Sequence, residues 1–246
     1  EVGLSILNDG GNAVDAAVAT GFALAVTYPR AGNLGGGGFM LIHSADSNEQ
    51  TMIDYRETAP AKATRNMFLD DAGEIDRGRA YFSHQSSGVP GTVAGLIYAL
   101  ENYGSMSLHK VLAPAIKLAT RGFPVSYALN NEIGARAEGL KKNKEAKKLF
   151  FKPDGSAYEI GDTLRQPELA RTLKRIARKG AKGFYEGDVA ERIVEDMAAN
   201  KGLISAQDLA SYRAIERAPV RGSFREFDIA SVGPPSSGGI HIIQML

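Results

Sequence analysis

The sequence predicts a mixed α/β fold built around an antiparallel hairpin. Two apolar runs, residues 39–43 and 51–56, flank the short polar stretch 44–50, which is the spacing of a β-hairpin. The first run begins Phe39-Met40-Leu41-Ile42 and has no polar residue in those four positions, so we expect that strand to be covered on both faces. Helical patterns precede and follow the hairpin. They predict either helix layers outside one sheet or two stacked sheets.

Two helices are expected before the hairpin. Residues 2–9 have a helical pattern that Gly10-Gly11 would end in the left-handed conformation. Asn12 is a typical N-cap, and Asp15 three residues later is a weaker form of the capping box. This second helix is predicted to run to about Tyr28. Its many small residues favour close packing in a core rather than chemistry.

The rest of the chain is predicted to be mainly helical. Periodicity and capping residues predict helices over residues 91–103, 107–121, 126–141, 167–180 and 188–200, and a short one after Ser205. Residues 214–220 and 224–232 then predict a closing hairpin that turns at Arg221-Gly222-Ser223, before a last helix that starts near Gly238. The chain begins at Glu1 and stops within a helical pattern. We therefore expect residues 1–246 to form a single domain that is an incomplete fragment of a longer protein.

Composition excludes several classes of function. The 246 residues include 29 Lys and Arg and 28 Asp and Glu, so no overall charge would attract nucleic acid. There is no Cys, which excludes a disulfide framework, a thiolate nucleophile and a Cys-based zinc site. No stretch is long and apolar enough to predict a membrane span. The one charge run, Lys141 to Lys148, has no interleaved aromatic residues and is interpreted as a solvated helix face.

The glycine run Gly35-Gly36-Gly37-Gly38 is interpreted as a close-approach loop. Without Cβ atoms, its backbone can lie very near another segment. A phosphate-binding loop needs the order strand, glycines, helix, whereas here the order is helix, glycines, strand, and no Gly-Lys-Ser/Thr follows. The sequence therefore disfavours nucleotide binding, and no cofactor is expected.

No catalytic residue is assigned within this chain. It lacks the G-x-S-x-G motif, and its histidines are scattered without the spacing of a helical metal site, so no metal is expected: His43, His84, His109 and His241. One loop contains both Ser83-His84 and Ser86-Ser87. A serine–histidine pair there would depend on geometry that the sequence does not reveal.

Arg56 is the candidate binding residue. It follows the second strand, and Pro60 lies four residues beyond it, so its backbone is expected to be a rigid mount. A guanidinium can bind a carboxylate through two parallel hydrogen bonds. The residues alone leave two alternatives: a clamp on a small acidic ligand, or a structural ion pair with Glu57, Asp54 or another carboxylate.

Several motifs closely resemble the large subunit of bacterial γ-glutamyltranspeptidases. The clearest is Asp54-Tyr55-Arg56-Glu57-Thr58-Ala59-Pro60, and the others occur in order along the whole chain at residues 10–17, 31–40, 88–95, 202–205, 208–209 and 234–239. This resemblance implies the N-terminal-nucleophile hydrolase fold, an αββα sandwich of which this chain would be part. It also implies that Arg56 holds the α-carboxylate of a γ-glutamyl substrate.

The resemblance implies the following activity. A precursor cuts itself into large and small subunits, and the new N-terminal threonine of the small subunit attacks glutathione or another γ-glutamyl compound. Water or an amino acid then resolves the acyl-enzyme, and no cofactor is involved. The partner would be the small subunit of the same precursor, and bacterial members are usually periplasmic or secreted. The alternatives are a related acylase or capsule depolymerase, or a non-catalytic module that binds small carboxylates.

Overall fold

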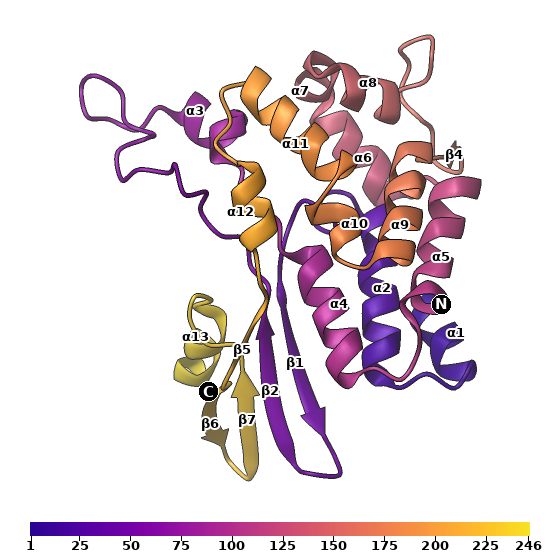
Figure 1. Cartoon of the computed structure of the whole chain (residues 1–246), viewed down its shortest axis with the longest axis vertical. Coiled ribbons are helices and arrows are strands. Elements are labelled where there is room, and N and C mark those ends of the chain that lie inside the picture. Colours follow the sequence, from indigo (N-terminus) through magenta and orange to yellow (C-terminus); the bar gives the residue numbers. More distant parts are fainter. The chain divides into compact units, whose positions relative to one another are not determined.

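The computed structural model describes residues 1–246 (Figure 1), and its contacts divide the chain into two compact units. Unit 1 comprises residues 1–33 and 104–184, and unit 2 comprises residues 34–103 and 185–246. The single domain expected over residues 1–246 stays a prediction. None of the helices combines the length and hydrophobicity that a membrane span requires.

Unit 1 is almost entirely helical. Helix α2 packs against α1 and α5, and α5 packs against α9. A two-residue strand pair, β3 (Phe123–Pro124) and β4 (Thr163–Leu164), follows α5. The helices are α1 (Val2–Asn8), α2 (Ala13–Thr27), α5 (Leu108–Arg121), α6 (Tyr127–Ala135), α7 (Ala137–Lys142), α8 (Lys144–Phe150), α9 (Pro167–Lys179) and α10 (Lys182–Tyr185), whose last residue belongs to unit 2.

The helix boundaries in unit 1 largely follow the local signals. Gly10 and Gly122 adopt φ angles of +88° after α1 and α5, and the full capping box between Asn12 and Asp15 is present at the start of α2. The single helix expected over residues 126–141 is wrong. It breaks at Arg136 (φ −115°, ψ 9°) into α6 and α7, where the nearby Gly134 and Gly139 lower the helix propensity.

Unit 2 contains the predicted hairpin in a three-stranded sheet. Strand β1 (Phe39–Ser44) pairs antiparallel with β2 (Glu49–Asp54), and β2 pairs antiparallel with β5 (Ile215–Arg217). Helix α4 (Thr92–Tyr103) contacts β2, whose Met52 and Ile53 are completely buried. The remaining helices are α3 (Arg77–Phe82), the 3₁₀ turn η1 (His84–Ser86), α11 (Asp188–Ala199), α12 (Ala206–Ser211) and α13 (Gly238–Met245).

The expectation that β1 is covered on both faces is wrong for this chain. Strand β1 lies at the edge of the sheet, and the side chain of Leu41 is 40% exposed. An apolar run shows that a strand can be covered, but it does not show which segment provides the cover. The buried strand is β2, which has a neighbour on each side.

A closing hairpin forms, but the first strand and the turn expected for it are wrong. Residues 215–217 form β5 and pair with β2 instead, and the hairpin begins only after Pro219, which has no N–H to donate to a ladder. Strands β6 (Val220–Phe224) and β7 (Phe227–Ser231) are joined at Arg225-Glu226, and Arg225 takes a left-handed φ of 53°. Gly222 lies inside β6 because helix α13 packs there. A Cβ on Gly222 would come within 2.6 Å of Ile243.

Candidate functional site

Arg56 lies two residues beyond the end of β2 and is held there by its backbone. The buried carboxylate of Asp54 accepts a hydrogen bond from the Arg56 backbone N–H (3.1 Å) and another from Nε of Arg217 (2.8 Å). The Arg56 carbonyl accepts a hydrogen bond from the hydroxyl of Tyr212 (2.8 Å). The backbone is therefore fixed from both sides, which gives the rigid mount expected from the sequence.

The guanidinium of Arg56 remains available to a ligand. Its Nη1 donates to the carbonyl of Pro235 at 3.0 Å, the residue is exposed, and the group forms no ion pair within the chain. Asp54 pairs with Arg217 instead. The structure therefore gives no support to the alternative in which Arg56 is a structural ion-pair partner. Most of the five N–H donors of the guanidinium stay free for a carboxylate.

The glycine run makes the predicted close approach to another segment, which is the one that contains Tyr55, the residue before Arg56. Gly38 exchanges two backbone hydrogen bonds with Tyr55 (3.2 and 3.0 Å), which extends the β1–β2 pairing by one residue. The carbonyl of Gly36 accepts from the backbone N–H groups of Gly91 and Thr92 (2.8 and 2.9 Å). A Cβ on Gly37 would lie 2.5 Å from the Tyr55 carbonyl oxygen, so glycine is required there for the close approach.

The ring of Tyr55 packs so closely against helix α4 that only a glycine fits at the contact position of the helix. A Cβ on Gly95 would lie 2.0 Å from Cγ of the Tyr55 ring. Burial of the hydroxyl raises the pKa of Tyr55 above its usual value. Tyr55 is therefore a neutral packing residue that fixes the chain segment just before Arg56.

A stacked tyrosine pair supports the backbone of Arg56. The rings of Tyr185 and Tyr212 are parallel within 4°, with centroids 5.9 Å apart. The hydroxyl of Tyr185 donates to the carbonyl of Pro90 (2.8 Å) and accepts from the backbone N–H of Ala94 (3.2 Å). Burial raises the pKa of Tyr212, and the nearby charges of Asp54 and Glu57 raise it further, so its hydroxyl stays protonated and donates to Arg56.

A hollow of about 470 Å³ adjoins this segment within unit 2. It brings together the start of the glycine run at Gly35, the stretch Glu57–Pro60 that follows Arg56, and the loop that contains Ser86 and Ser87. Its size is that of a small-molecule site. Sequence reasoning singled out these three segments separately but did not predict that they share one hollow.

The serine–histidine loop does not form a catalytic pair. The Ser83 hydroxyl donates to the carbonyl of Arg79 (2.6 Å), and the Ser86 hydroxyl donates to the carbonyl of Ser83 (2.7 Å). Nε2 of His84 bonds instead to Oδ2 of Asp196 (3.0 Å). In the chain as a whole, no group of three or more His, Asp or Glu side chains is placed to hold a metal ion.

Sequence reasoning missed Tyr185, Tyr212 and Arg217 as parts of this site, and it considered Asp54 only as a possible ion-pair partner of Arg56, whereas Asp54 holds the Arg56 backbone. Asp54 belongs to the Asp-Tyr-Arg-Glu motif, which was a signal that it could be involved. The two tyrosines lie 129 and 156 positions after Arg56 in chain order and carry no local motif, so only the fold brings them to it.

Comparison with known proteins gives consistent matches over the whole chain. The family profile described as gamma-glutamyltranspeptidase matches residues 1–246. A glutathione hydrolase proenzyme of Escherichia coli is 53% identical over 246 residues, which is 100% of this chain and 42% of that protein. The chain thus spans less than half the length of the curated relatives it matches.

Solved structures match equally well. The crystal structure of Helicobacter pylori gamma-glutamyltranspeptidase has a TM-score of 0.97 and 48% identity over 99% of this chain and 70% of that one. The transpeptidase enzyme CapD of Bacillus anthracis has a TM-score of 0.80 and 38% identity over 100% of this chain and 75% of that one. The expected fold class, an α/β fold of the N-terminal-nucleophile hydrolase type, is confirmed for the part that this chain spans.

Proposed function

This chain belongs to the γ-glutamyltranspeptidase family, and on that premise we propose that the whole protein is a γ-glutamyltransferase and glutathione hydrolase. The activity cleaves the γ-glutamyl amide of glutathione or a related donor and transfers the acyl group to water or to an amino acid or peptide. The 246 residues correspond to part of the large subunit. The nucleophile is the N-terminal threonine of a small subunit released from the same precursor.

The observation that carries this proposal is an exposed Arg56 guanidinium without an ion pair, on a fixed backbone. Its main chain is held by Asp54 and Tyr212, and its guanidinium has only the hydrogen bond from Nη1 to the carbonyl of Pro235. An anchored guanidinium can hold the α-carboxylate of the donor and so orient the γ-amide towards the nucleophile. The hollow beside Glu57 would receive part of the donor.

The first prediction concerns Arg56→Lys in the full protein. Lysine keeps the charge but loses the planar two-point contact. We expect kcat/KM for γ-glutamyl-p-nitroanilide to fall by about a hundredfold, which corresponds to about 3 kcal/mol of transition-state binding. Self-cleavage should still produce two subunits on a denaturing gel, because that step uses no γ-glutamyl donor.

Two controls test whether the loss comes from the contact between Arg56 and the α-carboxylate of the donor. A donor without the α-carboxylate should be a poor substrate for the wild type and hardly worse for Arg56→Lys, because the two changes remove the same contact. Arg192→Lys, an exposed position on α11, should leave kcat/KM unchanged. Failure of Arg56→Lys to mature, or equal losses with both donors, would argue for a structural role instead.

The alternative activities are distinguished by substrate. A capsule depolymerase would prefer polymeric γ-glutamyl donors, and an acylase would prefer acyl groups other than γ-glutamyl, whereas we expect glutathione to be the better substrate. Export to the periplasm or the medium is part of the proposal and would be checked by cell fractionation. Participation in glutathione metabolism would be checked by following glutathione breakdown in cells that lack the protein.

A further inference from the structure

A second cavity, of about 320 Å³, lies wholly within unit 1 and is separate in its residues from the Arg56 site. It is bounded by the residues that follow α2 and by helices α6, α7 and α8. Much of its wall is apolar: Leu129 and Ile133 are buried, and Leu140 and Phe150 are half-buried. The half-buried pair would lose further contact with water if a ligand filled the cavity.

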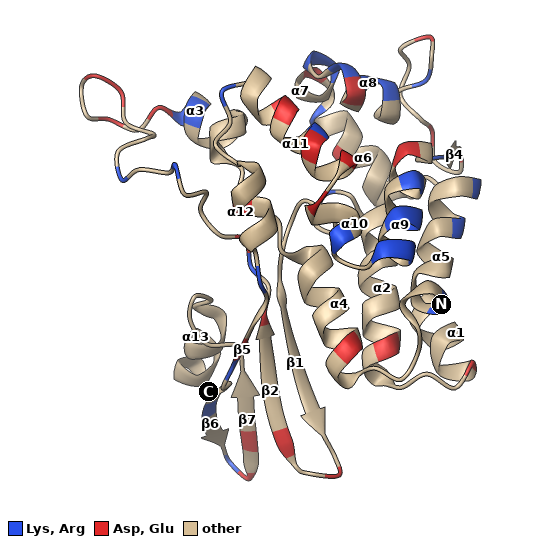
Figure 2. Cartoon of the chain, viewed as in Figure 1, with Lys and Arg blue, Asp and Glu red and all other residues tan.

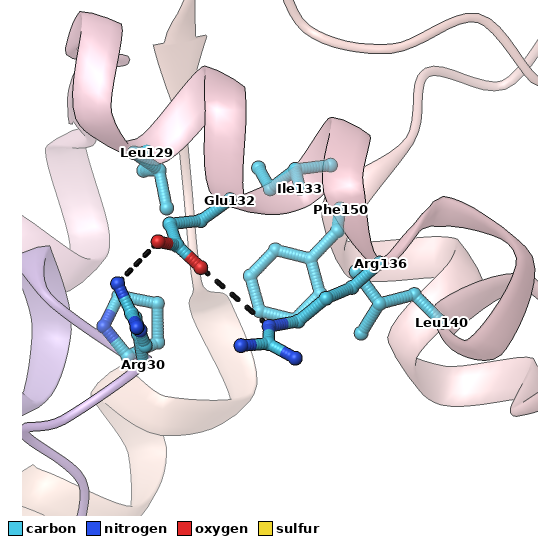
Figure 3. Close-up of a pocket in the computed structure, with 8 residues that line it drawn as sticks. Arg30, Leu129, Glu132, Ile133, Arg136, Leu140 and Phe150 are labelled. Carbon is cyan, nitrogen blue, oxygen red and sulfur yellow. Dashed lines mark hydrogen bonds and ion pairs between the residues drawn. The ribbon is translucent and has the colours of Figure 1, made fainter.

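Two arginines share one glutamate at the cavity (Figure 3). Arg30 and Arg136 both form ion pairs with Glu132, in the second case from Nε of Arg136 to Oε2 at 3.5 Å. This arrangement leaves one net positive charge. Arg136 has no other partner within the chain, so its Nη1 and Nη2 donors are free, and its side chain is 62% exposed.

The sequence places charge and apolar surface on one helix face. Leu129, Glu132, Ile133 and Arg136 follow the spacing i, i+3, i+4 and i+7, so they share a single face of α6 and its C-cap. The break at Arg136 ends α6 there and starts α7, whose Leu140 together with Phe150 of α8 closes the cavity. Exposed ion pairs stabilise a fold by only about 0–1 kcal/mol, so stability alone gives little reason for this arrangement.

The surrounding charge favours an anion. Residues 136–152 contain seven Arg and Lys and two Glu, although the whole chain has a net charge of only +1. Figure 2 shows these basic segments on α7 and α8, the helices that bound the cavity. Such a local field raises the concentration of small anions near the site.

We infer that this cavity binds a small carboxylate that has a compact apolar body. The carboxylate would accept two hydrogen bonds from the free Nη edge of Arg136, and the apolar body would fill the space between Ile133, Leu140 and Phe150. Glu132 holds Arg30 and the Nε side of Arg136, which orients the guanidinium towards the ligand. The cavity volume is at the lower end of the range for small-molecule sites.

The test uses the mature full-length protein and 4-phenylbutyrate as the probe, with binding measured by isothermal titration calorimetry. We expect Arg136→Gln, which removes the charge, and Leu140→Trp, which fills the cavity, each to weaken binding by about tenfold or more. Arg171→Gln on α9, whose guanidinium pairs with Glu168, should bind like the wild type. The neutral 4-phenylbutyramide should bind at least about tenfold more weakly than the acid.

Each opposite result overturns the inference. Absence of measurable binding to the wild type would do so, as would unchanged binding to Arg136→Gln or equal binding of the amide. Loss of binding in Arg56→Lys with retention in Arg136→Gln would place the probe in the site of the proposed donor. Circular dichroism melting curves show whether the two cavity variants are folded, and Arg136→Lys, which keeps the charge, should recover part of the affinity.

Discussion

At the scale of single residues, Asp15 shows what local sequence signals capture and what they omit. The capping box with Asn12 was predicted from the four residues involved and is present. The same carboxylate is fully buried and also accepts hydrogen bonds from Ser105 (backbone 2.9 Å, hydroxyl 2.6 Å) and from the backbone of Met106 (3.0 Å). These partners lie 90 and 91 positions away, so only the fold brings them to Asp15.

The second prediction concerns Asp15→Asn. Burial by itself would raise the pKa of Asp15, but the hydrogen bonds from Ser105, Met106 and Asn12 outweigh it, and the pKa is lowered. We expect the variant to lose about 1–3 kcal/mol of unfolding free energy at neutral pH, because an amide cannot accept all these bonds. Urea unfolding measures the loss.

The pH dependence of this loss follows from the lowered pKa. A carboxylate with a depressed folded pKa contributes stability above its unfolded pKa, and that contribution disappears as the pH falls through the folded value. The difference between the wild type and Asp15→Asn should therefore be constant near neutral pH and shrink below about pH 4. Asp46→Asn, in the exposed turn between β1 and β2, should unfold like the wild type at neutral pH. A gap that widened in acid would contradict the assigned hydrogen-bond pattern.

The third prediction concerns Tyr212→Phe, which keeps the ring stacked on Tyr185 but removes the donor to the Arg56 carbonyl. One neutral hydrogen bond is worth about 0.5–1.5 kcal/mol, so we expect KM for γ-glutamyl-p-nitroanilide to rise roughly two- to tenfold with a smaller change in kcat. Tyr81→Phe, on the exposed face of α3, should leave both constants unchanged.

A double variant separates positioning from general damage to the site. If Tyr212 acts through Arg56, the combination with Arg56→Lys should be no worse than Arg56→Lys alone. A fall in kcat at constant KM, or additive losses in the double variant, would mean that Tyr212 does not position the guanidinium.

At the scale of elements, the two hairpins show when a glycine can be interpreted from sequence. The β1–β2 hairpin was predicted correctly because a polar loop separates two apolar runs. In the closing hairpin, Gly222 was interpreted as the turn, but it lies opposite Ile229 in the ladder and makes room for Ile243 of α13. The sequence alone does not distinguish a glycine that a turn requires from a glycine that a close approach between segments requires. Only the packing partner distinguishes them.

The fourth prediction compares two glycines that both lie within helices. In α4, a Cβ on Gly95 would overlap the ring of Tyr55, whereas in α6 a Cβ on Gly134 would meet no atom within 4 Å. We expect Gly95→Ala to be severely destabilising, by about 3 kcal/mol or more, because backbone and ring must both shift. Gly134→Ala should be neutral or stabilise by about 0.5–1 kcal/mol. Thermal melting of the two variants measures both effects, and similar midpoints would contradict the packing of Tyr55 on α4.

At the scale of the whole molecule, the sequence motifs predicted the family and with it the fold class, and both are confirmed. The motifs also directed attention to Arg56, although its role as a clamp is still a prediction. What they could not give was the environment of β1, whose apolar side chains were expected to be covered on both faces. Strand β1 is an edge strand with Leu41 exposed, because a hydrophobic pattern records a need for burial without identifying the covering segment.

The last prediction concerns this 246-residue chain on its own. Catalysis of acyl transfer needs a nucleophile beside a base, and the loop that offered such a pair does not supply it, because Ser83 and Ser86 donate to carbonyls while His84 pairs with Asp196. We therefore expect no turnover of γ-glutamyl-p-nitroanilide by the isolated chain, and turnover by the full protein under the same conditions. The full protein carrying Ser86→Ala should remain active, since that serine only bonds within its own turn. Turnover by the isolated chain that was lost in its Ser86→Ala or His84→Ala variant would instead place the nucleophile in this loop and remove the role we assign to the small subunit.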